Sequence, residues 1–282
     1  MRSGPFPFVL TAALLGGLCA APPAGAAPLT PLSSAVITSD PLGSPTWDGV
    51  RAALFGDAPL VFDDQHVFLS APRKVEDGWQ VPVSFQVKGL GKIRQIILTA
   101  DLNPAPRVLT FHPTEAEPRL ALRIKVDQAS VLHGAAQTED GVWHVAGLQV
   151  DAPGGGCTVP SASQSQQLWK TRLNESQGQA WRRADGGDRL RLRILHPMNT
   201  GFVVGIPAFF IDHLVVKTAE GRTVAEMETA EPVSENPTLT LDLTPQGHSD
   251  KGYRVEWSDV DGNQGSAFIP PARQSLREES AP

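Results

Sequence analysis

Hydrophobic and polar residues alternate along most of the chain with a period of two. In one run, Val81, Val83 and Phe85 alternate with Ser84 and Gln86. The same alternation recurs in four further runs, at residues 119–127, 189–194, 238–243 and 253–257. This pattern is typical of β-strands that bury one face and expose the other. It predicts a chain built mainly of half-buried strands.

Turn-forming residues separate these runs. They include Glu139-Asp140-Gly141, Ala219-Glu220-Gly221 and Asp261-Gly262-Asn263. Short strands with frequent Gly, Pro and Asp turns favour β-sandwiches over α/β folds. One helix is expected from Trp47 to Phe55, with Thr46 as its N-cap. The predicted fold class is therefore all-β.

A change in composition divides the chain near its middle. Residues 153–185 contain three consecutive glycines and a Ser/Gln-rich stretch, and they show no strand alternation. Enough strands precede and follow this segment to form one sandwich each. We therefore expect four segments after the leader: a sandwich at 40–152, a flexible Gly/Ser/Gln-rich connecting arm at 153–185, a second sandwich at 186–270 and a disordered tail at 271–282.

The first residues have the pattern of a signal peptide. Arg2 is followed by an uncharged apolar run from Phe6 to Ala20, and Ala24-Gly25-Ala26 provides small residues for cleavage. The run is shorter than the roughly 20 apolar residues of a membrane-spanning helix. We expect residues 1–26 to be removed and the mature protein to be soluble and exported, to the periplasm if the host is bacterial.

Charge and cysteine content narrow the possible functions. The formal net charge of −6 argues against nucleic acid and anionic membranes as partners. Cys19 lies in the leader and is lost when the leader is cleaved, so Cys157 is the single cysteine of the expected mature chain. A lone exported cysteine is a buried bystander, an intermolecular bridge or a reactive thiol.

The context of Cys157 favours a functional thiol. Gly154, Gly155 and Gly156 precede it, and three glycines in a row predict a flexible tether. Such a tether would let the thiol move by about 13 Å, at roughly 3.3 Å per residue. A loosely held cysteine lacks the fixed base and oxyanion donors of a catalytic nucleophile. We therefore predict a carrier and not an enzyme.

Particular strings resemble two related families. The first half resembles SoxY, the cysteine-bearing subunit of the SoxYZ carrier of bacterial thiosulfate oxidation; the similar pieces are Trp47–Phe55, Leu69-Ser70-Ala71-Pro72, Val81-Pro82-Val83, Asp101-Leu102-Asn103-Pro104 and the Gly-Cys stretch. The second half resembles SoxZ, in His196-Pro197-Met198-Asn199-Thr200-Gly201-Phe202, Ile206-Pro207-Ala208, Ser234-Glu235-Asn236-Pro237 and Trp257-Ser258-Asp259.

The resemblance implies two immunoglobulin-like sandwiches in one chain. It also implies that Cys157 binds sulfur intermediates covalently, with Gly154–Gly156 as the tether, while separate periplasmic enzymes load, oxidise and release the sulfur. No cofactor or metal is expected beyond the sulfur cargo. Because both halves of the SoxYZ pair lie in one chain, we expect an intramolecular Y–Z interface and a monomer.

Two departures from the family pattern leave an alternative open. In SoxY the cysteine usually lies at the chain terminus, between glycines, whereas here Thr158, Val159 and Pro160 follow it and the chain continues into the SoxZ-like half. Single-chain proteins of this kind resemble a group associated with PQQ-dependent quinoprotein dehydrogenases. The alternative function is therefore a non-catalytic accessory module for such a dehydrogenase. A redox enzyme ranks last, because Cys157 has no second cysteine to resolve a disulfide.

Two weaker features suggest metal binding only at first sight. His196 and Met198 are two residues apart, as in some soft-metal sites, but no further ligand is evident. Asp259, Asp261 and Asn263 are spaced like the start of a calcium loop, but the downstream glutamate is missing. We expect both groups to stabilise turns, and no metal site.

Overall fold

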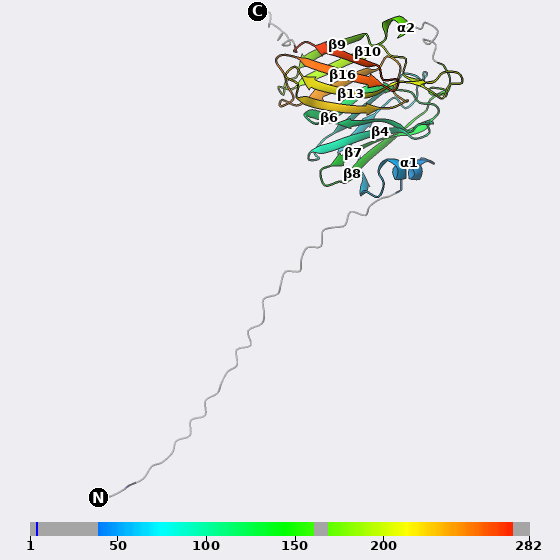
Figure 1. The fold of residues 1–282 in the computed structure, drawn as a ribbon. Coiled ribbons are helices and arrows are strands. Elements are labelled where there is room, and N and C mark those ends of the chain that lie inside the picture. Colours follow the sequence, from blue (N-terminus) through cyan, green and yellow to red (C-terminus); the bar gives the residue numbers. More distant parts are fainter. Residues whose placement is uncertain (1–3, 5–38, 161–168, 273–282) are drawn as a thin grey trace, which may run out of the picture. The chain divides into compact units, whose positions relative to one another are not determined.

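The computed structural model describes residue 4 and residues 39–160 and 169–272. Residues 39–160 and 169–272 form one compact unit of β-sheets (Figure 1). The predicted signal peptide, apart from Gly4, lies outside the described residues, as do the Ser/Gln-rich stretch 161–167 and the tail from residue 273. In the described segments, no helix is both long and apolar enough to cross a membrane.

The described residues confirm the all-β prediction. The larger sheet has nine strands in the order β1 (Leu60–Phe62), β8 (Trp143–Val150), β7 (Ser130–Thr138), β4 (Ile93–Ala100), β5 (Arg107–His112), β14 (Thr223–Thr229), β13 (Ile211–Thr218), β16 (Tyr253–Asp259) and β17 (Gln264–Ile269). The second sheet has six strands, β2 (Val67–Ser70), β3 (Val81–Val87), β6 (Ala116–Ile124), β15 (Thr238–Leu243), β10 (Asp188–Ile194) and β9 (Ser176–Arg182). A small hairpin pairs β11 (Asn199–Thr200) with β12 (Ala208–Phe209).

Both sheets run without a break from the first half of the chain into the second. In the nine-stranded sheet, β5 pairs antiparallel with β14 and places Phe111 opposite Met227. In the six-stranded sheet, β6 pairs antiparallel with β15 and places Leu120 opposite Leu241. Backbone hydrogen bonds therefore join the two halves in both layers. We call these two strand pairings the seam.

The alternation in the sequence decides which face of each strand is buried. In β3, Val83 and Phe85 are 2% and 1% exposed, whereas Ser84 between them is exposed. Inward-facing residues from both sheets and both halves make one hydrophobic cluster. Removal of apolar surface from water, at about 25 cal/mol per Å², is the main stabilising contribution to such a core. The two sandwich halves are therefore held by a shared core as well as by the seam.

The turns and the first helix follow the sequence closely. Gly141, Gly221 and Gly262 have φ values of +89°, +92° and +84° at the three predicted turns. The predicted helix is α1 (Trp47–Leu54), but Thr46 does not cap it with its side chain. The Thr46 hydroxyl instead donates to the carbonyl oxygen of Asp101 at 3.0 Å. The helix is thus fixed to the loop after β4.

The segment 153–185, predicted to be a flexible arm without strands, contains regular structure. Helix α2 (Trp169–Arg172) lies in it, and β9 pairs with β10 along its whole length. The inward positions of β9 are Ser176, Gly178 and Ala180, so the strand has no large apolar side chains to reveal it. Gly178 is small for a reason: a Cβ there would approach Cγ1 of Ile269 to 2.5 Å.

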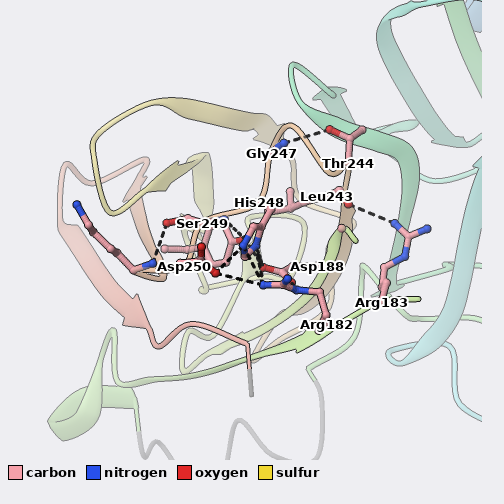
Figure 2. Close-up of polar contacts among 12 residues, drawn as sticks. Arg182, Arg183, Asp188, Leu243, Thr244, Gly247, His248, Ser249 and Asp250 are labelled. Carbon is pink, nitrogen blue, oxygen red and sulfur yellow. Dashed lines mark hydrogen bonds and ion pairs between the residues drawn. The ribbon is translucent and has the colours of Figure 1, made fainter. Parts of the chain in front are cut away.

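A buried carboxylate fixes the end of the second half (Figure 2). Asp188 is fully buried at the start of β10 and accepts hydrogen bonds from Arg182 Nε at 2.7 Å and His248 Nδ1 at 2.8 Å. The hydroxyl of Tyr253 also donates to it, and burial together with this bond raises the pKa of Tyr253. One carboxylate therefore links β9, β10, β16 and the loop that carries His248.

We predict that Asp188→Asn lowers the free energy of unfolding by about 3 kcal/mol. The amide keeps the shape of the side chain but removes the charge that compensates Arg182, and breaking a buried pair costs about 3–5 kcal/mol. Urea denaturation with an unchanged m-value measures the loss. The matched control is Asp250→Asn, at the exposed edge of the same network; its side chain is 90% exposed, and the change should leave stability nearly unchanged. Equal stabilities of the two variants would contradict the role of Asp188.

Candidate functional site

Cys157 lies in a turn shortly after β8, and its side chain is buried. It is a free cysteine with 2% of its surface exposed. The turn packs against Gly78 and Val126, near the end of β6. This corrects the expectation of an exposed, freely moving sulfhydryl, because the structure holds the thiol inside the protein.

The three glycines before Cys157 are needed for conformation and space. Gly154 and Gly155 have φ values of +99° and +80°, which side-chain-bearing L-residues rarely adopt. A Cβ on Gly156 would lie 2.5 Å from the carbonyl oxygens of both Gly78 and Val126. The glycine run, which predicts a loose tether, therefore forms a specific tight turn here. The same composition permits both, so the sequence alone did not distinguish them.

Side chains from both halves of the chain hold this turn closed. Asp127 Oδ1 accepts hydrogen bonds from the amides of Cys157 at 2.9 Å and Thr158 at 3.1 Å, and from the Thr158 hydroxyl at 2.9 Å. From the second half, Thr200 Oγ1 donates to the carbonyl oxygen of Cys157 at 2.7 Å. We call these four bonds the clamp. Asp127, the acceptor of three of these bonds, lies in the loop after β6, and Thr200, the donor of the fourth, lies in β11.

A buried lysine, Lys125, lines the same small cavity as Cys157. Its side chain is almost fully buried, and its ammonium donates to the carbonyl oxygens of Met198 and Glu231. Burial lowers its pKa to about 8, although the charge of Cys157 acts in the opposite direction. Its backbone amide also donates to the carbonyl oxygen of Pro232 at 2.6 Å. Lys125 therefore joins the first half to the second directly beside Cys157.

A very small cavity adjoins the thiol. Its volume is about 20 Å³, and it is lined by Trp79, Lys125, Gly156, Cys157, Val159, Pro197, Met198, Asn199, Thr200, Val203, Ile206 and Glu235. A space of roughly 10–15 Å³ is the minimum for one water molecule. The closed site therefore has room for about one small atom beside the sulfur. A larger group on Cys157 requires the turn to move.

The loop between β11 and β12 forms one wall of the cavity and is apolar on its outer side. Val203 and Ile206 line the cavity, while Phe202 is 39% and Val204 100% exposed. Val159, directly after the cysteine turn, is 49% exposed, and its carbonyl accepts a bond from Trp79 Nε1. Exposed apolar side chains therefore surround the closed thiol.

Burial makes the closed thiol unreactive. It raises the pKa of Cys157 to about 12, with the ammonium of Lys125 opposing the shift and Asp127 adding to it. At neutral pH the closed site therefore holds a thiol, whereas the thiolate is the nucleophile. Exposure of the sulfur to water would remove the cause of this shift.

His196 and Met198 stabilise a turn, as predicted. The amide of Met198 donates to His196 Nδ1 at 3.1 Å, and His196 Nε2 faces Asp259 Oδ2 at 3.3 Å. Burial lowers the pKa of His196 to about 4, so the ring is neutral. Asp259 Oδ1 in turn accepts from the amides of Asp261 and Asn263, each at 3.0 Å. Among the residues that the structure describes, no cluster suited to a metal ion occurs.

Sequence reasoning missed Lys125, Asp127 and Thr200. Lys125 and Asp127 follow the polar positions of the β6 alternation, which predicts solvent-facing side chains for both. However, β6 ends at Ile124, so the alternation no longer determines where the next residues point. Thr200 lies in a two-residue strand and carries no signal of its own.

Family comparisons match both halves of the chain. The model "Sulfur oxidation protein SoxY" matches residues 51–157, ending at the cysteine. The model "Sulphur oxidation protein SoxZ" matches residues 179–269. A search of curated protein sequences found no match. The two families correspond, in the same order, to the resemblances identified in the sequence.

Solved structures with some likeness cover only part of the chain. The sulfur carrier protein SoxY from Chlorobium limicola f thiosulfatophilum is 25% identical over 38% of this chain and 96% of its own, with a TM-score of 0.34. A superoxide reductase (neelaredoxin) from Ignicoccus hospitalis is 21% identical over 31% of this chain and 80% of its own, with a TM-score of 0.27.

The buried lysine leads to a prediction about stability and pH. In the folded state the pKa of Lys125 is about 8, against 10.5 normally, so folding disfavours its charged form. The cost of burying the charged ammonium is fully present below pH 8, and it disappears as the pH rises toward 10.5. We therefore expect the stability of the parent protein relative to Lys125→Met to rise between pH 8 and pH 10, by at most about 1.4 kcal/mol per pH unit.

The measurement is urea denaturation of both proteins in a Cys157→Ser background, which removes the titration of the thiol. The matched control is Lys92→Met, which removes a side chain that is 71% exposed and should give a difference that stays constant over this pH range. A flat difference for Lys125→Met over the same range would show that the ammonium is not held in a desolvated site.

Proposed function

From the premise that the chain combines a SoxY domain with a SoxZ domain, of a sulfur oxidation carrier family, we propose that it carries sulfur covalently on Cys157 and presents it to partner enzymes. One observation carries this proposal. Cys157 is the only free cysteine in the described part of the chain, and it is held where the two halves meet, between Asp127 and Thr200.

The carrier reaction is the formation of a sulfur–sulfur bond to Sγ of Cys157. With thiosulfate as cargo, the thiol loses one proton and the pair loses two electrons to an electron-accepting partner protein, which leaves a Cys–S–S–SO₃⁻ adduct. With an already oxidised donor such as tetrathionate, the thiolate displaces thiosulfate and no external oxidant is needed. Both routes use a thiolate, which the closed site disfavours.

Opening of the turn is therefore part of the proposed cycle. The cavity of about 20 Å³ does not accommodate an adduct of this size. We propose that the clamp is released when a partner binds, so that Cys157 becomes exposed and acidic enough to react. The closed state then protects the thiol from unrelated oxidants between encounters.

The remaining parts of the proposal concern location and partners. The leader pattern at residues 1–26 supports export, and a periplasmic site agrees with sulfur oxidation enzymes as partners. The described residues offer Cys157 no resolving cysteine, which supports a carrier over an enzyme. The seam supports a monomer that provides its own Y–Z interface. The alternative role beside a quinoprotein dehydrogenase has no specific observation in its favour.

We predict that protein purified from its native host during growth on thiosulfate carries a sulfur adduct on Cys157, and that Cys157→Ser abolishes this growth. Intact-mass and peptide mass spectrometry detect the adduct, which a reductant removes. Cys19→Ser is the matched control, because it lies in the expected leader and should leave growth unchanged. An unmodified thiol in the purified protein together with normal growth of Cys157→Ser would refute the carrier role.

We also predict that Asp127→Ala exposes the thiol. The substitution removes the acceptor of three hydrogen bonds, and a bond to a charged group is worth about 1.5–3 kcal/mol. The rate of Cys157 modification by tetrathionate or iodoacetamide at pH 7 should therefore rise at least about tenfold, since about 1.4 kcal/mol corresponds to a factor of ten. Peptide mapping assigns the label to Cys157.

Two further variants test the clamp independently of folding defects. Thr200→Val removes the donor to the Cys157 carbonyl from the other half of the chain and should also raise the rate. Asp140→Ala, whose carboxylate bonds Thr138 and Val142 in the turn between β7 and β8, is the control and should leave it unchanged. Unchanged rates for both Asp127→Ala and Thr200→Val, with normal circular dichroism, would show that these bonds do not keep the site closed.

A further inference from the structure

The outer face of the six-stranded sheet carries arginines at alternating positions. Arg189, Arg191 and Arg193 point outward from β10, because Leu190 and Leu192 between them are buried. Arg119 and Arg123 point outward from β6 in the same way. Five arginines thus share one face of a chain whose net charge is −6.

These arginines fall into two groups. Arg119 and Arg189 both contact Asp242, the nearly buried residue between them on β15, at 3.2 and 2.6 Å. Arg123, Arg191 and Arg193 are exposed and make no ion pair or side-chain hydrogen bond with any described residue. Three uncompensated cations on neighbouring positions repel one another, so they do not help the fold. They are therefore available to an external anion.

A shallow hollow of about 450 Å³ lies beside the free arginines. Its lining includes Ser84, Ala121, Arg123, Arg191 and Thr240. Small outward side chains form its floor, since Ser84, Ala121 and Thr240 are paired across adjacent strands. The hollow crosses the seam: Arg123 comes from the first half, and Arg191 and Thr240 from the second. The pairing of β6 with β15 therefore brings the two sides of the hollow together.

The spacing of the arginines indicates the kind of anion that fits. Arg191 and Arg193, two residues apart on one strand, lie about 6.6–6.8 Å apart along it. Arg123 and Arg193 lie on β6 and β10, which β15 separates, so they are about 9.5 Å apart at two strand spacings. A single small oxyanion does not span these separations at the level of the strands. Carboxylates on alternate residues of an extended peptide repeat at the same distance as Arg191 and Arg193.

We propose that this face is a docking surface for an extended acidic segment of a partner protein, with carboxylates at alternate positions bound by Arg191 and Arg193. The backbone of the segment lies over the small residues of the hollow. Phe68 and Trp181, 42% and 39% exposed on the same face, flank the site. Exposed aromatic residues and arginine are enriched in protein interfaces. Because the hollow includes both halves, such a partner recognises the assembled carrier.

The test uses two labelled eight-residue peptides of identical composition and charge. In one, glutamate alternates with threonine; in the other, four glutamates precede four threonines. Fluorescence anisotropy at low salt should show at least about tenfold tighter binding of the alternating peptide to the parent protein than to Arg191→Glu/Arg193→Glu, since two ion pairs are replaced by repulsion. Binding should weaken as salt screens the charges.

The matched control is Arg94→Glu/Arg254→Glu, which makes the same change in net charge at exposed residues of the other sheet and should keep affinity within about twofold of the parent. If both peptides bound equally well, or if both double variants lost the same affinity, net charge alone would explain the binding. Either result would overturn the proposal. Competition by sulfate at equal molarity would identify a small-anion site instead. No binding of either peptide would also overturn it. None of these outcomes depends on Cys157, so the carrier proposal is tested separately.

Discussion

The structure depends on backbone pairing between the two halves of the chain, β5 with β14 and β6 with β15. This pairing determines what surrounds Cys157. The end of β6 leads into Lys125 and Asp127. Beyond β10, the segment that leads into β11 places the carbonyl of Met198 and the hydroxyl of Thr200 opposite them. Neither half by itself contains a closed cysteine site. The docking surface proposed on the outer face has the same origin, because its hollow lies across the β6–β15 pair.

Burial has opposite electrostatic effects on the two titratable groups of the site. It raises the pKa of Cys157 to about 12 and lowers that of Lys125 to about 8, because each charged form loses hydration. The mutual attraction of thiolate and ammonium opposes both shifts but does not overcome them. The closed site therefore favours a neutral thiol, and opening restores ordinary acidity to it. In the proposed carrier cycle, protection and reactivity of Cys157 are thus two positions of one turn.

The sequence predicted the parts of the fold in which local pattern and burial agree. The strand runs, the three glycine turns and α1 were all visible, because alternation and turn chemistry act on neighbouring residues. Strand β9 was not, since its inward residues are Ser176, Gly178 and Ala180. Cys157 was identified as the important residue, but its burial was not foreseen. Three glycines favour both a loose chain and a tight turn, and only the close approach of Gly78 and Val126 decides between them. The alternation over residues 119–127 predicts a solvent-facing Lys125, but β6 ends at Ile124 and the next side chains no longer follow it.

The covalent continuity of the chain favours the closed position of the cysteine turn. A cysteine near a free chain end gains much conformational entropy when it leaves a binding site, but here the chain continues past Cys157 into the second half. A segment fixed at both ends gains less entropy on release, since its ends stay constrained. The few hydrogen bonds from Asp127 and Thr200 therefore suffice to hold the turn. In the proposed cycle, opening then requires favourable contacts made elsewhere by a partner, for which the exposed apolar loop at Phe202 and Val204, beside the cavity-lining Val203, offers a surface.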